Sequence, residues 1–347
     1  MAIEKQSTDV SSVGPKWPPQ RSSFNRVKGI YDLAIVSESN ALKDVLETID
    51  ASIQDMVVED DKGAAMDRLS VRVLLTSDCL VGNTGSLASL GEAVVPLSGS
   101  PEFEDVNILY LGHNLPTRLS NIDDLRRAVL NVEKAATRGK SKCSTITERA
   151  KEQGFRLEVL DSMSKTDDVT QDQMANLYKR FGWNSSEVRQ ILSSEGNIIA
   201  VAKCAGKIVS AGIAETVMVT FETGEVLRIA EITEAATDEE FQGRGLYSAV
   251  AATLVKELNR LSRDNALLGG QIDLVFGECN GNEPGVLKAV KSLGRTFAYE
   301  ISKEMGLPFK GYLQQHVPIA GAPRATPYND LFPAFITRTN IEEFVKS

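Results

Sequence analysis

The sequence predicts a mixed α/β (α+β) protein, in which a smaller α/β domain precedes a domain whose mixed, mostly antiparallel central sheet is flanked by helices. The chain has 347 residues, 42% of them hydrophobic, which is enough to bury two cores. β-rich and amphipathic segments alternate early, and a three-strand meander precedes a helix later. We expect a flexible segment at 1–24, domains at 25–150 and 155–320, and a C-terminal extension at 321–347.

Composition excludes several classes of function. The net charge of −9 and the pI of about 5.1 disfavour nucleic acid as a partner. Four scattered cysteines, without a C-x-x-C pair, and two histidines argue against a structural metal site and for a reducing, cytoplasmic location. No apolar run approaches the roughly 20 residues that cross a bilayer, and the polar N-terminus lacks the apolar core of a secretory signal. We therefore expect neither a metal nor a membrane partner.

In the first domain, β-rich runs alternate with helical periodicity. Apolar residues recur at helical spacing in 40–56, and Ser120 is the expected N-cap of a helix over 120–140. The Gly/Ser-containing stretch after residue 80 is expected to connect strands, and the basic 137–145 is the most linker-like segment. Strands are predicted at 30–37, 68–77 and 105–113.

The second domain shows a more informative order of elements. A strand at 155–161 is followed by helices at 170–183, with Thr170 as the expected cap, and at 185–196. Three meandering strands and a helix from Leu246 come next. The predicted meander strands are 197–206, 207–222 and 226–237, and the later elements are a strand at 272–280, a helix at 283–294 and strands at 296–303 and 312–319.

The loop between the third meander strand and the next helix, "EEFQGRGLYS", carries two glycines and no proline. The first N–H groups of a helix have no partner inside it, and the helix dipole favours an anion there. Gly243 and Gly245 allow the backbone to approach a bulky phosphate. The loop lacks the third glycine of G-x-G-x-x-G, which makes a Rossmann site a poor fit.

"QGRGLY" matches most of the Q/R-x-x-G-x-G/A signature of the GCN5-related N-acetyltransferase (GNAT) superfamily, and the order of elements over about 155–320 resembles that family's order. "AEITEAATDEEFQGRGL" and "GYLQQHVPIAG" further resemble the subgroup of bacterial β-lysine acetyltransferases. The resemblance implies a GNAT-like fold that uses acetyl-CoA or another acyl-CoA as co-substrate. The first 150 residues resemble no family that we can name.

The resemblance also implies positions for the cofactor. The loop would hold its pyrophosphate, the end of the preceding strand would offer main-chain groups to the pantetheine arm, and Asn282 would contact the cofactor. Tyr247 departs from the signature, which usually has Gly or Ala there, so its side chain must turn away from the diphosphate. The loop residues are Gln242, Gly243, Arg244, Gly245, Leu246, Tyr247 and Ser248, and the strand residues are Ala235, Ala236 and Thr237.

Two glutamates in the strand before the loop are candidates for the catalytic base. Glu231 and Glu234 have apolar neighbours in the sequence, which favours a raised pKa and a role as proton acceptor near neutral pH. By resemblance, the distance in sequence from Glu231 to Gln242 is the one at which several relatives carry their catalytic base. Because the offset of three places the two on opposite faces of a regular strand, Glu234 shares the site only if a bulge intervenes; it could instead bind the substrate's ammonium group. The tyrosine that many relatives use as general acid has no counterpart in 283–294.

These observations predict an enzyme that transfers an acetyl or other short acyl group from acyl-CoA to a primary amine of a small molecule or amino acid, in a ternary complex. An acidic protein suits a cationic acceptor. One alternative is a protein or long-chain acyl N-acyltransferase. Another is a non-catalytic acyl-CoA-binding regulatory protein. The role of the first domain and a homodimeric assembly are left open.

Overall fold

The structure is a computed structural model and describes residues 30–36, 70–82, 87, 91–97, 99, 101–112, 122–179, 185–194, 196–220, 225–264, 269–318 and 328–347. For 30–36 it describes the backbone only. The segment 1–24, the helix predicted at 40–56 and the expected cap Ser120 lie outside these residues.

The larger of two sheets has eight strands, in the order β10-β12-β9-β8-β7-β6-β5, with β11 paired to β12. β8 and β9 are parallel, and the other neighbours in this sheet are antiparallel, which confirms the predicted mixed, mostly antiparallel sheet. The strands are β5 Arg156–Leu160, β6 Asn197–Cys204, β7 Lys207–Thr220, β8 Val226–Thr237, β9 Leu274–Asn280, β10 Thr296–Phe297, β11 Leu313–Pro318 and β12 Tyr328–Thr337.

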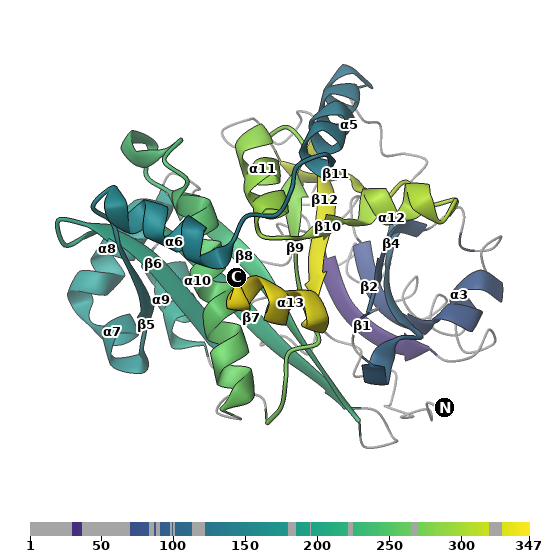
Figure 1. The fold of residues 1–347 in the computed structure, drawn as a ribbon, viewed down its shortest axis with the longest axis horizontal. Helices are drawn as coiled ribbons and strands as arrows, with labels where there is room; N and C mark the ends of the chain where they lie inside the picture. Colours follow the sequence, from purple (N-terminus) through teal and green to yellow (C-terminus); the bar gives the residue numbers. More distant parts are fainter. Residues whose placement is uncertain are drawn as a thin grey trace, which may run out of the picture.

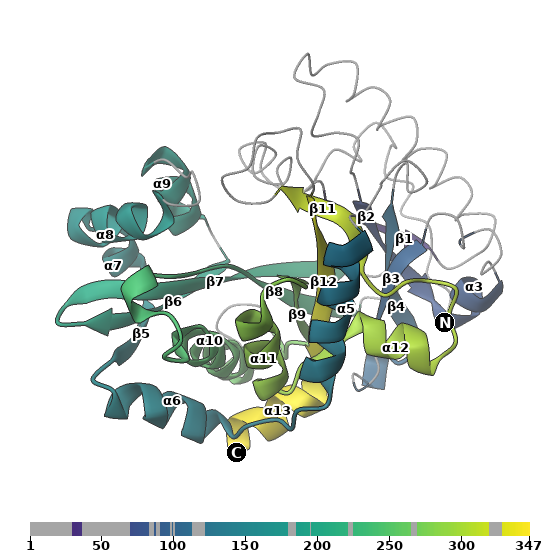
Figure 2. The ribbon, with the colours of Figure 1, turned by 90° about the horizontal axis from the view of Figure 1, so that it is seen from above.

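Helices cover both faces of this sheet (Figures 1 and 2). Alternate residues of β6 divide between the two faces, as the pleat requires: Ile199 and Val201 pack with α8 and α9, whereas Ile198 and Ala200 pack with α10. The helices are α3 Ser77–Gly82, α5 Ile122–Ala136, α6 Cys143–Glu152, α7 Ser162–Thr166, α8 Asp168–Tyr178, α9 Ser185–Ser193, α10 Leu246–Arg263, α11 Pro284–Ser292, α12 Ala298–Glu304 and α13 Arg338–Lys346.

The smaller sheet has the strand order β1-β2-β4-β3 (β1 Ile30–Val36, β2 Ser70–Thr76, β3 Gly91–Pro96, β4 Val106–Gly112). β3 lies inside the stretch that the sequence assigns to a connection. Ile108 and Val95 of this sheet belong to the same apolar cluster as Ile229 and Phe276 of β8 and β9. The two sheets therefore share one hydrophobic core.

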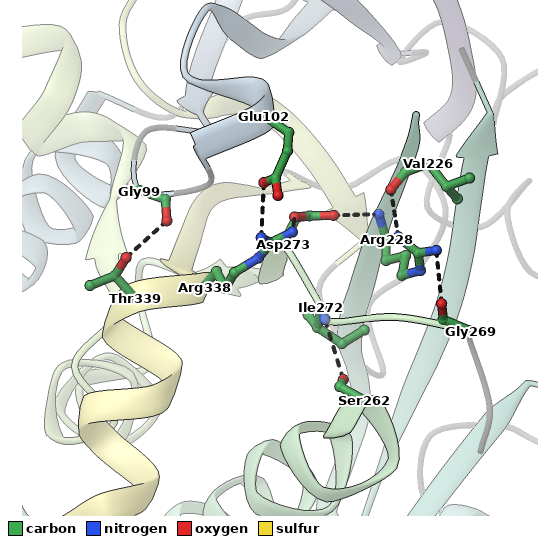
Figure 3. A network of polar contacts seen from close by, with 10 residues as sticks. All are labelled: Gly99, Glu102, Val226, Arg228, Ser262, Gly269, Ile272, Asp273, Arg338 and Thr339. Carbon is green, nitrogen blue, oxygen red and sulfur yellow. Dashed lines mark hydrogen bonds and ion pairs between the residues drawn. The ribbon is translucent and has the colours of Figure 1, made fainter. Parts of the chain in front are cut away.

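A polar network also joins the two sheets near the start of β9 (Figure 3). The carboxylate of Asp273 accepts hydrogen bonds from the Arg338 guanidinium and from the Arg228 backbone N–H, the latter at 2.8 Å. Arg338 of α13 also binds Glu102, beside the small sheet, at 2.8 Å. Burial raises the pKa of Asp273 against the effect of Arg338. The C-terminal helix is thus tied to both sheets.

Several sequence predictions need correction in detail. The strand predicted at 296–303 is a two-residue strand followed by α12, because the Glu300 carboxylate accepts from the Phe297 N–H at 2.9 Å and stabilises a helix start. Thr170 lies inside α8, whose N-cap is Asp167. Residues 321–347 are more than an extension, because β12 lies between β9 and β10 within the large sheet.

β8 carries a bulge just before the glycine loop. Thr233 pairs with Ile213 and Ala236 with Ala211, so that Glu234 and Ala235 together lie opposite Gly212. Such bulges redirect a strand and are frequent beside active sites. This is the irregularity that the sequence analysis required for Glu234 to share a site with Glu231. The side chain of Glu234 lies outside the described part of the structure.

Candidate active site

The candidate site begins where β8 and β9 stop pairing. Their parallel register runs only from Ile229↔Leu274 to Glu231↔Phe276, although both strands continue. Beyond that point, residues of both strands line a cavity of about 1220 Å³. This volume exceeds the roughly 300–1,000 Å³ of most small-molecule sites, so the cavity suits a long ligand.

The glycine loop forms one wall of this cavity. Gly243 and Gly245 have φ angles of 76° and 79°, which residues other than glycine rarely adopt. A Cβ at either position would meet nothing within 4 Å, so the space in front of the loop is open. Gly245 is the N-cap of α10 and provides no side-chain cap, which leaves the first-turn N–H groups available to an anion. The loop thus fits a diphosphate.

Four cationic side chains also line the cavity. Arg244 and Lys288 come from the loop and from α11, and Arg138 and Arg149 come from the segment before α6 and from α6. The segment around Arg138 has the composition of a linker, and neither Arg138 nor Arg149 is predicted from the sequence as a site residue. For Arg138 the only sequence signal is the basic composition of 137–145, and for Arg149 there is none. Guanidinium groups bind phosphate well because they donate in a planar fork.

Tyr247, the departure from the family signature, is half-buried and packs against the apolar cluster around Cys279, Leu287 and Val290. Burial raises the pKa of its phenol, which therefore stays protonated at neutral pH. Burial also raises the pKa of the Cys279 thiol to about 12, so this cysteine is no thiolate nucleophile. Both residues line the cavity as neutral groups.

The structure brings most of the predicted cofactor residues to this cavity. All seven loop residues, Gln242 to Ser248, line it, as do Ala235 and Thr237. Among the described residues, Ala236 and Asn282 do not belong to the lining, although Asn280 and Glu283 on either side of Asn282 do. The carbonyl of Ala236 accepts a hydrogen bond from Ser210 at 2.9 Å.

Glu231 lies at the end of the β8–β9 pairing and is 7% exposed. The residues that contact Glu231 in space are more polar than its neighbours in the sequence. Arg72 of β2 donates to Glu231 Oε2 at 3.0 Å, and the same guanidinium stacks over Phe276 with 5.0 Å between the carbon Cζ and the ring centroid. The nearby cation favours the ionised carboxylate and opposes the effect of burial. A residue of the small sheet is therefore part of this site.

A second carboxylate, Glu278 of β9, completes the cluster. Tyr110 of β4 donates its hydroxyl to Glu278 Oε1 at 2.7 Å, and Arg72 Nη1 lies 3.8 Å from the same oxygen. Glu278 belongs to the cavity lining, whereas Glu231 does not. Sequence reasoning missed Arg72, Tyr110 and Glu278. The only sequence signal for each of them was a polar side chain within a β-rich run.

Arg295, which follows α11, is 1% exposed, and none of its three guanidinium nitrogens has a hydrogen-bond partner within the described chain. Its Nη1 lies 3.4 Å from the position that a Cβ on Gly277 would take, near the end of the β8–β9 pairing. An unpaired buried charge costs several kcal/mol. The folded chain therefore keeps a destabilising cation beside the cavity wall.

We expect the Arg295→Met variant to be more stable than the wild type by about 1–3 kcal/mol, because it removes an unpaired buried charge and keeps the apolar volume. Urea denaturation measures the difference. Arg338→Met is the matched control and should lose stability, because it leaves the fully buried carboxylate of Asp273 without its ion pair. An equal loss of stability in both variants would contradict an unpaired cation at Arg295.

Two further features of the described residues bear on the site. No group of three or more His, Cys, Asp or Glu side chains in this part of the chain is arranged to hold a metal ion. Within the same residues, no helix combines the length and the apolar character needed to cross a membrane.

No protein family model matches the chain, and no curated protein matches its sequence. Solved structures match part of the chain. The ribosomal-protein-S18-alanine N-acetyltransferase of Escherichia coli is 14% identical, with a TM-score of 0.37; the match covers 53% of this chain and 94% of that one. A GNAT-family acetyltransferase of Streptococcus pneumoniae is 12% identical (TM-score 0.35; 53% and 98% covered).

A third structure, Arabidopsis thaliana NAA60 in complex with acetyl-CoA, is 9% identical, with a TM-score of 0.39 and coverage of 53% of this chain and 99% of that one. The E. coli and S. pneumoniae proteins are described as acetyltransferases, the class that the sequence resembles. The β-lysine subgroup stays a prediction.

Proposed function

We propose that this chain is a GNAT-type N-acyltransferase that moves an acetyl or other short acyl group from acyl-CoA to a primary amine. The observation that carries the proposal is the placement of the glycine loop. It lies at the N-terminus of α10 and on the wall of the cavity that opens where β8 and β9 part. A helix start with left-handed glycines binds a diphosphate, and separated strand ends offer main-chain groups to an extended arm.

Different residues along the cavity would contact different parts of the cofactor. Gln242 to Ser248 would hold the diphosphate, with Arg138, Arg149 and Lys288 as further cations, and Ala235, Ala236 and Thr237 would contact the pantetheine arm. Asn282, in the turn between β9 and α11, stays a candidate contact. When bound, acetyl-CoA supplies the activated acyl group.

Acyl transfer to an amine requires a proton acceptor. The amine nitrogen bonds to the carbonyl carbon, the carbon–sulfur bond breaks with its electron pair on sulfur, and the nitrogen loses a proton. Glu231 and Glu278 are carboxylates near the end of the β8–β9 pairing, and Glu234, in the bulge of β8, stays a candidate.

Buried acidic residues favour a cationic acceptor of small size. Glu215 of β7 lies directly opposite Glu231 in the sheet register, and the two are 9% and 7% exposed. Directly opposite residues share one face of the sheet. Two carboxylates on one buried face suit a small amine or amino acid better than an anionic substrate. Neither the glycine loop nor the cavity volume fixes the length of the acyl chain.

The test is a panel of amines, amino acids and peptides incubated with acetyl-CoA, read by release of free thiol and by mass spectrometry of the acceptor. We expect turnover with small cationic amines. The double variant Glu231→Gln/Glu278→Gln should lose turnover by about 100-fold to 10,000-fold while still binding acetyl-CoA, because a proton acceptor contributes that much. Acylation of peptides alone would favour the protein acyltransferase. Binding without turnover for any acceptor would favour the regulatory protein.

A further inference from the structure

We propose that Glu278 is the carboxylate that accepts the amine proton, and that the small sheet holds it in place through Tyr110. This inference rests on the proposed function and deepens it. It assigns the catalytic base to β9 instead of β8, and it gives the first domain a part in the active site.

The two carboxylates that the structure brings together differ in their access to the cavity. Glu278 is one of the lining residues, along with its neighbours Cys279 and Asn280 and with Thr233 across the gap. Glu231 does not belong to the lining and lies at the last paired position of β8 and β9. A proton acceptor must come within hydrogen-bond reach of the amine. The Glu278 side chain is 4% exposed and that of Glu231 9%, but only Glu278 belongs to the lining of the space where the amine would lie.

The two carboxylates also differ in how closely the cation holds them. Arg72 Nη1 lies 3.0 Å from Glu231 and 3.8 Å from Glu278. A carboxylate in a close ion pair is stabilised in its charged form, which weakens it as a proton acceptor. The Arg72 guanidinium is therefore paired more closely with Glu231, which we assign to positioning this cation.

Tyr110 fixes the orientation of Glu278. Its side chain is fully buried and donates to Glu278 Oε1 at 2.7 Å. Burial, and after it the charge of Glu278, raises the pKa of this phenol well above its ordinary value. Tyr110 therefore remains a hydrogen-bond donor at every pH at which the enzyme is assayed. The titratable and charged groups near Glu278 include Tyr110, Arg72, Glu231 and the neutral thiol of Cys279, and the buried Arg295 guanidinium lies beside the adjacent Gly277.

The small sheet contacts this site through Arg72 and Tyr110. Arg72 and Tyr110 lie opposite each other in the register of β2 and β4, so one face of the small sheet presents both toward β8 and β9. Their partners are 159 and 168 residues away in the sequence. Detaching the small sheet would remove both the cation and the phenol from the carboxylates.

The experiment compares Glu278→Gln, Glu231→Gln and Tyr110→Phe with the wild type, with the best amine of the panel. It measures kcat/KM against pH, the Kd of acetyl-CoA and the thermal midpoint. For Glu278→Gln we expect a loss of about 100-fold to 10,000-fold in kcat/KM and the disappearance of its acidic limb, with acetyl-CoA still bound. Glu231→Gln should lose less than about 10-fold in kcat/KM, keep the limb, and show a lower thermal midpoint.

In Tyr110→Phe, the acidic limb should move to higher pH. The lost hydrogen bond stabilised the charged carboxylate, so the pKa of Glu278 rises when the bond is removed. A purely structural tyrosine would change the thermal midpoint and leave the limb in place. This variant also tests the inference if Glu278→Gln does not fold.

Two results would overturn the inference while leaving the proposed function intact. One is an active Glu278→Gln enzyme with a wild-type pH profile, and the other is loss of the acidic limb in Glu231→Gln alone. If the wild type itself neither binds acetyl-CoA nor releases thiol with any amine, the proposed function fails, and the inference fails with it.

Discussion

Replacing Arg72 by methionine is expected to lower the free energy of unfolding by about 3–5 kcal/mol. The Arg72 side chain is 6% exposed and that of Glu231 9%, so water cannot replace the lost guanidinium. The variant leaves the carboxylate of Glu231 buried without this ion pair, and it removes the cation from the ring of Phe276. Urea denaturation followed by circular dichroism measures the loss.

Arg260→Met is the matched control for this prediction. Arg260 also pairs with carboxylates, those of Glu257 and Asp264, but it lies on the surface with a side chain 55% exposed. Exposed ion pairs contribute at most about 1 kcal/mol. The double variant Arg72→Met/Glu231→Leu should regain part of the stability, because it removes both buried charges. Equal losses for Arg72→Met and Arg260→Met would contradict the buried pair.

Replacing Gly245 by valine is expected to weaken acetyl-CoA binding by about 100-fold, since two or more charge-assisted hydrogen bonds would be lost. Gly245 has φ 79° and ψ 14°, a conformation that a β-branched residue strongly disfavours. The loop must change its path, and the N–H groups at the start of α10 then point away from the diphosphate. Isothermal titration calorimetry measures the affinity.

Gly206→Val provides the control for backbone strain. Gly206 lies in the turn between β6 and β7 with φ 81°, and a Cβ there also meets nothing within 4 Å. The two variants should therefore lose similar stability, whereas only Gly245→Val should lose acetyl-CoA. If both bind acetyl-CoA as the wild type does, the loop does not hold the diphosphate.

Elements with a strong local pattern could be predicted from the sequence. β8 occupies the predicted residues 226–237, and α10 begins at Leu246 as expected, because alternation and helical spacing are properties of consecutive residues. α12 could not be predicted, since Thr296, Phe297 and Tyr299 favour a strand and the helix depends on the bond from Glu300. β3 begins in a Gly/Ser-containing stretch, where composition suggests a connection.

The residues of the candidate site likewise fall into two groups: those that a local motif identifies, and those that only tertiary packing brings together. The glycine loop is a local motif, and its position at a strand-to-helix junction follows from neighbouring residues. The carboxylate cluster is a tertiary feature. Nothing near Arg72 in the sequence indicates a partner 159 residues away, and a Glu in a β-rich run such as that around Glu278 more often faces solvent. Only the packing of one sheet on the other distinguishes the two cases.

The most direct test of the central claim is calorimetric titration of the wild-type chain with acetyl-CoA and, in parallel, with S-acetylpantetheine, which lacks the diphosphate. If the loop before α10 is a diphosphate site, acetyl-CoA should bind at one site per chain with a Kd on the order of micromolar, and S-acetylpantetheine at least about 100-fold more weakly. Equal affinity for the two ligands, or no binding of acetyl-CoA at millimolar concentration, would contradict the proposed function.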